Sequence, residues 1–212
     1  MNYRYILILF FAFAAVNFAC SPDDDDGFTV IPPEDRGEQQ LKDNDSLLLY
    51  LETHYYNKYF FSDPSADYSK DDIIISESPM DEQGNPYTLL MTEVEMQTST
   101  FLDQEYIYYV LDLNSGSSGP KPNFTDVVSI NYTGFLSDDT VFDSSVNPIS
   151  QPLISVIPGW RDVLQDFNTA ENGAVENPDG TLSYSNYGFG VMFLPSGLAY
   201  FNLPPLGIPM FS

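Results

Sequence analysis

Short runs of β-branched and aromatic residues, separated by turn-forming clusters, dominate the second half of the chain. In Asp126–Phe135, apolar Val128 and Ile130 alternate with Ser129 and Asn131, the pattern of a half-buried antiparallel strand. The strand-like runs are Tyr87–Thr98, Glu105–Leu113, Asp126–Phe135, Val141–Asp143 and Gly188–Leu194, and Trp160–Phe167 predicts one short helix. The sequence therefore predicts an α+β domain that is mostly antiparallel sheet.

The region before these strands predicts a helical extension. Apolar residues recur at three- and four-residue steps over Glu38–Phe61, and the polar run Asp43–Ser46 supplies capping residues ahead of Leu47. His54 lies within this helix, and without a second ligand we expect it to be a packed or solvent-facing residue. Later in the chain, the polar stretch Asn168–Asn186 indicates an insertion, either a flap near a site or a surface loop.

Composition excludes several classes of function. The chain has 7 basic and 31 acidic residues, a formal net charge of -24. Binding to a phosphate backbone needs clustered Lys and Arg, so we expect no nucleic-acid partner. One Cys and one His exclude an intrachain disulfide, a Cys-cluster metal site and any site built from several histidines. We therefore expect no metal and no cofactor. Aromatic residues make up 15% of the chain, which is enough apolar surface for a packed core.

The N-terminus resembles a bacterial lipoprotein signal. The apolar run Tyr5–Val16 is shorter than the roughly 20 residues that span a bilayer, and the only Cys, Cys20, follows it directly. We expect a signal peptide at 1–19, lipid on Cys20 and an acidic tether at 20–37 that includes Asp23–Asp26. The alternative is an ordinary cleaved signal with an incidental Cys. The resemblance implies an outer-membrane lipoprotein of the cell envelope, periplasmic or surface-exposed.

Four segments fall in a recognisable order in the second half of the chain. They are Tyr132-Thr133-Gly134, Phe142-Asp143-Ser144-Ser145, Val156-Ile157-Pro158-Gly159-Trp160, and Leu198-Ala199-Tyr200 followed by Gly207-Ile208-Pro209. Their order and spacing resemble the FKBP-type peptidyl-prolyl cis-trans isomerases, in a lipoprotein form similar to those of Bacteroidetes. The resemblance covers residues 104–212, with 38–103 as an N-terminal extension of helix and strands.

The resemblance implies a fold and a set of site residues. The fold is an antiparallel sheet wrapped around a short helix. By position, Trp160 resembles the floor of a proline pocket, Tyr132 and Phe142 its aromatic walls, Val156 and Ile157 its apolar rim, Asp143 the carboxylate beside it, Tyr200 a phenol donor and Ile208 a late-loop apolar contact. The implied partners are proline-containing peptides and unfolded exported proteins, with macrolide inhibitors as further ligands.

Two departures from the family pattern keep other functions open. The aromatic residue that usually precedes the Val-Ile pair has no counterpart, because Gln151 or Leu153 stands there. The family's final strand, which follows the Ile-Pro motif, is also missing, so we expect a C-terminally incomplete domain or a strand supplied by a partner. The main expectation is an isomerase for exported proteins; the alternatives are a non-catalytic FKBP-like binding module and a component of a surface or motility complex.

Overall fold

The computed structural model describes residues 34–63, 66–116 and 118–211. The expected signal peptide, the lipidated Cys20 and the Asp23–Asp26 run lie outside the described residues. Residues 34–212 form one compact unit, and all further description concerns that unit.

The N-terminal helix α2 spans Arg36–Thr53, so the predicted range 38–61 is wrong at both ends. Asp35 is the N-cap, and its side chain accepts hydrogen bonds from the backbone N–H groups of Gly37 and Glu38. The predicted cap at Asp43–Ser46 is instead the middle of the helix, because this earlier carboxylate satisfies the first free N–H groups.

The chain after His54 is extended and does not continue the helix. Strand β1 (Tyr55–Tyr56) pairs with both β2 (Ile75–Ser76) and β3 (Thr88–Leu89) in a small antiparallel sheet, and the short 3-10 helix η1 (Lys58–Phe61) follows β1. Tyr55 and Tyr56 pair with a strand on each side. This strand pairing outweighs the helical spacing of Tyr55 and Tyr59, from which the longer helix was predicted.

The central sheet has the order β12-β5-β4 and is antiparallel throughout. Its strands are β4 (Glu95–Phe101), β5 (Gln104–Asn114) and β12 (Phe189–Phe193). The predicted run 87–98 is in fact β3, the 3-10 helix η2 (Leu90–Thr92) and the start of β4. The strands predicted at 105–113 and 188–194 are confirmed within one residue at each end.

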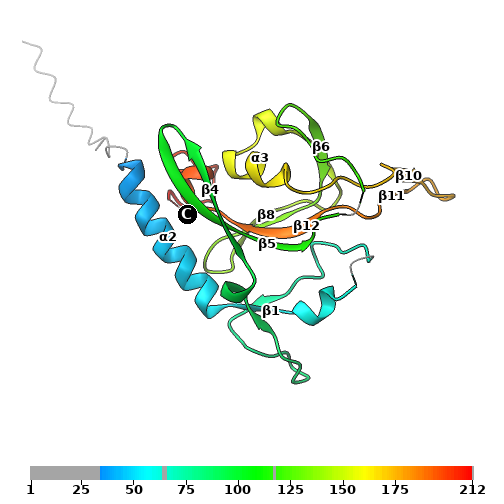
Figure 1. Cartoon of the computed structure of the whole chain (residues 1–212), viewed down its shortest axis with the longest axis horizontal. Helices are drawn as coiled ribbons and strands as arrows, with labels where there is room; N and C mark the ends of the chain where they lie inside the picture. Colours follow the sequence, from blue (N-terminus) through cyan, green and yellow to red (C-terminus); the bar gives the residue numbers. More distant parts are fainter. Residues whose placement is uncertain (1–33, 64–65, 117, 212) are drawn as a thin grey trace, which may run out of the picture. The chain divides into compact units, whose positions relative to one another are not determined.

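Two further strand pairs carry the segments singled out in the sequence. Strand β6 (Val127–Ile130) pairs with β9 (Ile149–Pro152), and β7 (Thr133–Phe135) pairs with β8 (Val141–Ser144). The predicted strand 126–135 is thus two strands, and β9 was not predicted. The insertion 168–186 contains a small hairpin, β10 (Val175–Glu176) and β11 (Leu182–Ser183), which extends away from the central sheet (Figure 1).

The core lies on both faces of strand β5. Tyr109 and Leu111 pack with Tyr50 and Leu51 of α2, whereas Tyr106 and Tyr108 pack with residues around the short helix α3 (Pro158–Leu164). Because side chains alternate along a strand, one face of the sheet receives α2 and the other receives α3. The predicted α+β fold with a sheet around a short helix is confirmed.

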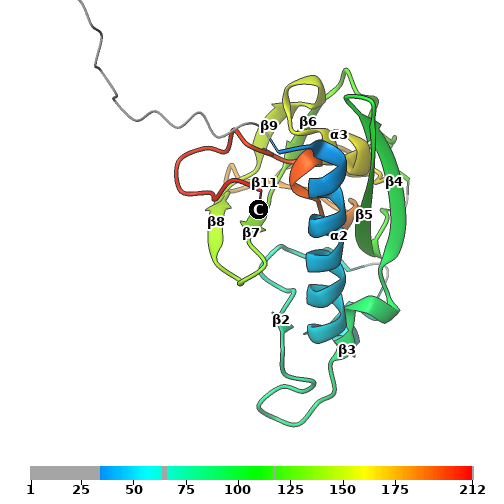
Figure 2. The same cartoon turned by 90° about the vertical axis from the view of Figure 1, so that its left-hand side faces the viewer.

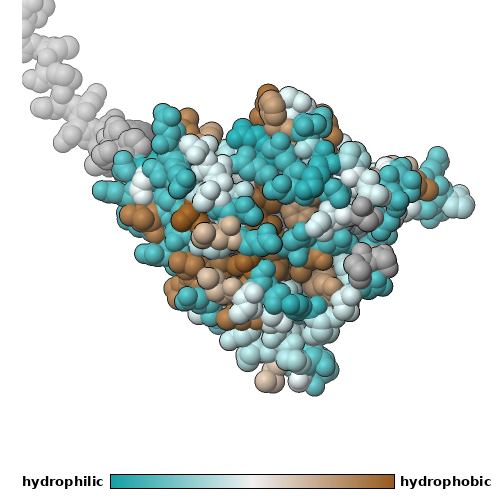
Figure 3. Space-filling view, viewed as in Figure 1, coloured by the Kyte–Doolittle hydropathy of each residue, from teal (hydrophilic) through white to brown (hydrophobic). Residues whose placement is uncertain are grey.

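Helix α2 also lies beside the β7–β8 hairpin. Figure 2 shows α2 with the β4–β5 pair on one side of it and the β7–β8 hairpin on the other. Apolar surface remains visible as a band across the middle of one face, over the central strands, with hydrophilic surface above it (Figure 3).

Two kinds of feature are absent from the described residues. No helix there is long and apolar enough to cross a membrane. No group of three or more His, Cys, Asp or Glu side chains there is arranged to hold a metal ion.

Candidate functional site

The start of helix α3 places Trp160. The 3-10 helix η3 (Leu153–Ser155) precedes it, Ile157 is the N-cap with extended backbone, and Pro158 occupies the first turn, where its missing N–H costs nothing. Gly159 is buried, and a Cβ atom there would lie 2.5 Å from Leu194 Cδ1. Glycine therefore lets the helix approach strand β12 closely, with Trp160 as the next residue.

Trp160 contacts Tyr132, and Tyr132 contacts Asp143. The Tyr132 and Trp160 rings meet edge to face with centroids 4.8 Å apart. The Tyr132 hydroxyl donates to Asp143 Oδ2 at 2.5 Å, and this hydrogen bond is the main reason that the pKa of Tyr132 rises to about 12. Tyr132 is therefore a neutral donor at physiological pH.

Tyr200 also lies close enough to Asp143 to feel its negative charge. Burial, and then the negative charge of Asp143, raise the pKa of the Tyr200 phenol. Tyr132, Asp143, Trp160 and Tyr200, which we call the aromatic cluster, thus come together from four separate segments. Asp143 is exposed and the three rings are half-buried, so the cluster is open to solvent.

The Phe142 ring makes a cross-strand contact with Gly134, and no contact described in the structure joins it to the aromatic cluster. A Cβ atom at Gly134 would lie 2.6 Å from Phe142 Cζ, so the tip of the phenyl ring rests on the Gly134 backbone. Gly134 pairs with Asp143 in the hairpin, which places Phe142 beside the cluster's carboxylate in the chain. Any other residue at 134 would displace the ring.

The base of the hairpin is closed by Ser145, a buried residue to which the sequence analysis gave no role. The Tyr132 N–H donates to Ser145 Oγ at 2.9 Å, and that hydroxyl donates to Asn131 Oδ1 at 2.5 Å. Its own N–H donates to the Tyr132 carbonyl. These bonds fix Tyr132 at the point where the chain passes from β6 to β7.

Tyr200 is supported from helix α2. The buried carboxylate of Asp43 accepts from the Ser196 N–H at 2.8 Å and from its hydroxyl at 2.6 Å, and Ser196 begins the 3-10 helix η4 (Ser196–Leu198). The Ser196 carbonyl accepts from Phe201 N–H, and the guanidinium of Arg36 lies 4.1 Å from the centre of the Phe201 ring. Asp43 was interpreted as a cap from its type alone, and only the fold shows this support.

For the remaining predicted residues, the structure gives burial and position but no described contact with the aromatic cluster. Val156 and Ile157 are half-buried between η3 and α3, next to Trp160 in the chain. Ile208 is half-buried in the C-terminal segment, and no contact described in the structure joins it to the aromatic cluster. Leu153 is fully buried, and Gln151 pairs with Val128 in the β6–β9 ladder.

A sheet around a short helix, with tyrosine, carboxylate and indole gathered at the start of that helix, defines an FKBP-like domain. Comparison with known proteins agrees. The family model of the FKBP-type peptidyl-prolyl cis-trans isomerases matches residues 119–197. FK506-binding protein 1 of Kluyveromyces lactis is 31% identical over 104 residues, which are 47% of this chain and 90% of that protein. The chain belongs to the FKBP-type peptidyl-prolyl cis-trans isomerase family.

Two bacterial relatives match over shorter regions. The FKBP-type peptidyl-prolyl cis-trans isomerase FkpA of Aeromonas hydrophila is 43% identical over 86 residues, 39% of this chain. The outer membrane protein MIP of Legionella longbeachae is 41% identical over 61 residues, 27% of this chain. The matches span only 26% and 25% of the length of these two relatives.

Proposed function

We propose that the protein is a peptidyl-prolyl cis-trans isomerase whose active site is the aromatic cluster together with Phe142, Val156, Ile157 and Ile208. The supporting observation is that Tyr132, Asp143, Trp160 and Tyr200 lie together at the start of α3. Family membership supports the same activity.

The chemistry requires no nucleophile. Rotation about an X-Pro amide has a barrier of about 20 kcal/mol, because the twisted amide loses its resonance. A site that binds the twisted amide about 4 kcal/mol more tightly than the planar forms accelerates rotation roughly a thousandfold. Apolar walls that exclude water and one or two hydrogen-bond donors supply such a preference.

Each residue takes a role that fits its position. The Trp160 indole receives the proline ring, with Tyr132 and Phe142 beside it and Val156 and Ile157 at the rim. Tyr200, whose phenol stays protonated, donates to a substrate carbonyl, and the Ile157 N–H donates to another. Asp143 holds the Tyr132 hydroxyl, and Ile208 closes over the substrate from the late loop.

The test measures, by exchange NMR, the rate of proline isomerisation in a short Ala-Leu-Pro-Phe peptide in the presence of the purified protein. We expect acceleration by the wild-type chain, a loss of at least tenfold in kcat/KM in Tyr200→Phe, and inhibition by a macrolide. Tyr187→Phe is the matched control, because the Tyr187 hydroxyl also donates to a carbonyl, that of Tyr68, but lies outside the site. A folded wild-type protein without acceleration would contradict catalysis.

A second candidate, a binding module without catalysis, is favoured by the missing aromatic residue before the Val-Ile pair. Gln151 or Leu153 stands in that part of the chain; Gln151 pairs with Val128 in a strand ladder, and Leu153 is fully buried in the core. Peptide binding by titration calorimetry, combined with no acceleration, supports this candidate. If the wild-type protein accelerates isomerisation and Trp160→Leu loses peptide binding and turnover to the same extent, the result supports the isomerase.

We further propose that the protein is anchored through lipid on Cys20 in the cell envelope and assists the folding of exported proteins. The sequence around Cys20 supports the anchor, and the Legionella relative is named as an outer membrane protein. Metabolic labelling with an alkyne fatty acid tests the anchor: we expect labelling of the wild-type protein and of Ser21→Ala, and none of Cys20→Ser. Labelling of Cys20→Ser would overturn it.

A further inference from the structure

The β7–β8 hairpin carries Phe142 and Asp143 but has little support of its own. Within the described part of the chain, these two strands pair only with each other. They are short, and the register shifts between Gly134 and Phe135. Because an isolated two-stranded hairpin is marginally stable in water, its orientation must be set by contacts from outside.

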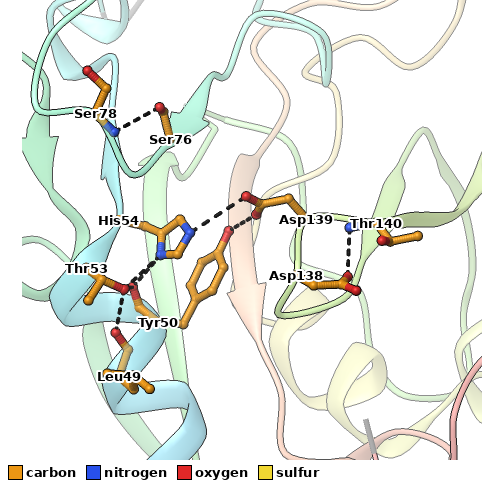
Figure 4. A network of polar contacts seen from close by, with 9 residues as sticks. All are labelled: Leu49, Tyr50, Thr53, His54, Ser76, Ser78, Asp138, Asp139 and Thr140. Atoms are coloured by element: carbon orange, nitrogen blue, oxygen red, sulfur yellow. Dashed lines mark hydrogen bonds and ion pairs between the residues drawn. The ribbon is translucent and has the colours of Figure 1, made fainter.

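The tip of the hairpin faces helix α2. Asp139 adopts a left-handed backbone conformation (φ 63°), and its N–H donates to the Leu136 carbonyl in the turn. Its carboxylate accepts from the Tyr50 hydroxyl at 2.7 Å, while His54 Nε2 lies 3.7 Å from its other oxygen (Figure 4). The carboxylate at the turn is therefore bonded to Tyr50 and lies close to His54, the C-cap residue of the helix.

Both partners on α2 are already ordered. Tyr50 and His54 are each 5% exposed, and their rings stack with centroids 3.7 Å apart and an angle of 11° between planes. His54 Nδ1 lies 3.0 Å from the Tyr50 carbonyl oxygen and 3.1 Å from Thr53 Oγ1, which fixes the imidazole plane. Burial, and then the bond to Asp139, raise the pKa of the Tyr50 phenol, so it remains a donor.

The two sides of this contact differ in burial. The Asp139 side chain is 51% exposed, whereas the helix is anchored by Leu51, which is fully buried between α2 and the sheet. Phe135, in β7, adds a ring contact 6.4 Å from Tyr50. Helix α2 is thus the more firmly packed partner in this contact, and the turn of the hairpin is the more exposed one.

We propose that Tyr50 is a positioning residue for the active site: by donating a hydrogen bond to Asp139, with its own ring stacked on His54, it orients the β7–β8 hairpin, and with it Phe142 and Asp143, toward a bound proline segment. This rests on the proposed function of the aromatic cluster. In this proposal the N-terminal extension affects substrate affinity through the hairpin, without a contact between α2 and the substrate.

The test compares two Tyr→Phe variants, each of which removes one hydrogen bond between α2 and another element. Tyr50→Phe keeps the stacked ring but removes the bond to Asp139. The control, Tyr109→Phe, removes the bond from the hydroxyl of Tyr109, in strand β5, to Asn44 Oδ1 of α2, a bond that involves no residue of the hairpin. We expect the amide NMR signals of Gly134, Phe142 and Asp143 to shift in Tyr50→Phe and to stay in place in Tyr109→Phe.

Kinetics and rescue separate positioning from general destabilisation. In Tyr50→Phe we expect KM for the proline peptide to rise about fivefold with little change in kcat, the size expected for one lost hydrogen bond. Asp139→Asn keeps an acceptor for Tyr50 and tolerates the left-handed backbone, so its KM should stay near wild type, whereas Asp139→Gly, which also tolerates that backbone, should match Tyr50→Phe.

The outcomes are decisive in either case. Equal amide shifts in Tyr50→Phe and Tyr109→Phe, or an unchanged KM in an active Tyr50→Phe variant, would overturn the positioning role. If the wild-type protein neither binds nor isomerises the peptide, the proposed function fails, and the amide comparison alone then supports or overturns the control of the hairpin by α2.

Discussion

The hydrogen bond between Tyr132 and Asp143 decides the protonation of the cluster. A phenol that donates to a carboxylate is stabilised in its neutral form, since ionisation would place two negative charges side by side. The same carboxylate acts on Tyr200 through its charge. Because both phenols have a raised pKa, Tyr132 and Tyr200 remain neutral hydrogen-bond donors at physiological pH.

The first prediction is that Asp143→Asn lowers the pKa of Tyr132 from about 12 toward the ordinary value near 10. Because folding raises this pKa, the stabilisation is fully present below about pH 10 and is lost as the pH rises through 12. The tyrosine Cζ chemical shift, titrated by NMR, measures it. Asp138→Asn is the control, since Asp138 bonds to Thr140; an equal shift in both variants would refute the assignment.

The second prediction concerns the buried carboxylate of Asp43. Asp43→Ala leaves the Ser196 N–H and hydroxyl without their acceptor, and Ser196 is only 2% exposed. We expect the free energy of unfolding to fall by about 2–4 kcal/mol. Urea unfolding measures it, with Asp45→Ala, at an exposed position of the same helix, as a control within about 0.5 kcal/mol of wild type. Equal values for the two variants would show that the Ser196 contact contributes nothing.

Among the elements, the β7–β8 hairpin depends on one glycine. Gly134 leaves room for the tip of the Phe142 ring, and covering a strand glycine with a cross-strand aromatic compensates for its missing side chain. The motif Tyr132-Thr133-Gly134 therefore has a packing reason for its last residue as well as a resemblance to a family.

The third prediction is that Gly134→Ala costs about 1–3 kcal/mol of stability, because the new Cβ atom and the Phe142 ring cannot share the space. In the double variant with Phe142→Leu the clash is relieved, so the two costs should be non-additive. Chemical denaturation of the wild type, both single variants and the double variant measures the coupling. Additive costs would show that the ring moves freely away.

Elements were predictable where one physical signal dominated. The run of Tyr, Ile and Val in Glu105–Leu113 predicted β5 correctly, because that strand is covered on both faces and is therefore apolar along most of its length. The extent of α2 was wrong because Asp35 competes with Asp43 as a cap, and sequence alone does not show that Asp43 is needed by Ser196. Strand β9 was missed because Ile149–Pro152 is too short and polar for periodicity to show.

The candidate site divides in the same way. Tyr132, Asp143, Trp160 and Tyr200 could be assembled from the order of four motifs, since motif spacing encodes the shared topology. Tyr50, His54 and Asp139 could not, because a contact between residues 89 positions apart, as in the Tyr50 to Asp139 bond, depends on how α2 docks. Helix spacing predicted a packed or exposed His54, without its partner.

For the whole molecule, charge opposes folding. The chain carries 31 acidic and 7 basic residues, and much of the basic charge is already paired. The described pairs of lysine or arginine are Lys42–Glu34, Lys58–Glu93, Lys70–Asp71 and Arg161–Asp162. The remaining carboxylates therefore repel one another across the surface, and folding brings them closer together.

The fourth prediction follows from this imbalance: raising NaCl from 20 to 500 mM shortens the screening length from roughly 20 Å to about 4 Å and should raise Tm. We expect an increase of roughly 2–4 °C, equivalent to about 1 kcal/mol for a chain of this size. Differential scanning calorimetry measures it, and KCl should act as strongly as NaCl if screening, and not sodium binding, is the cause. A fall in Tm would mean that the four ion pairs outweigh the repulsion. Their small individual contributions make that result difficult to reconcile with a net charge of -24.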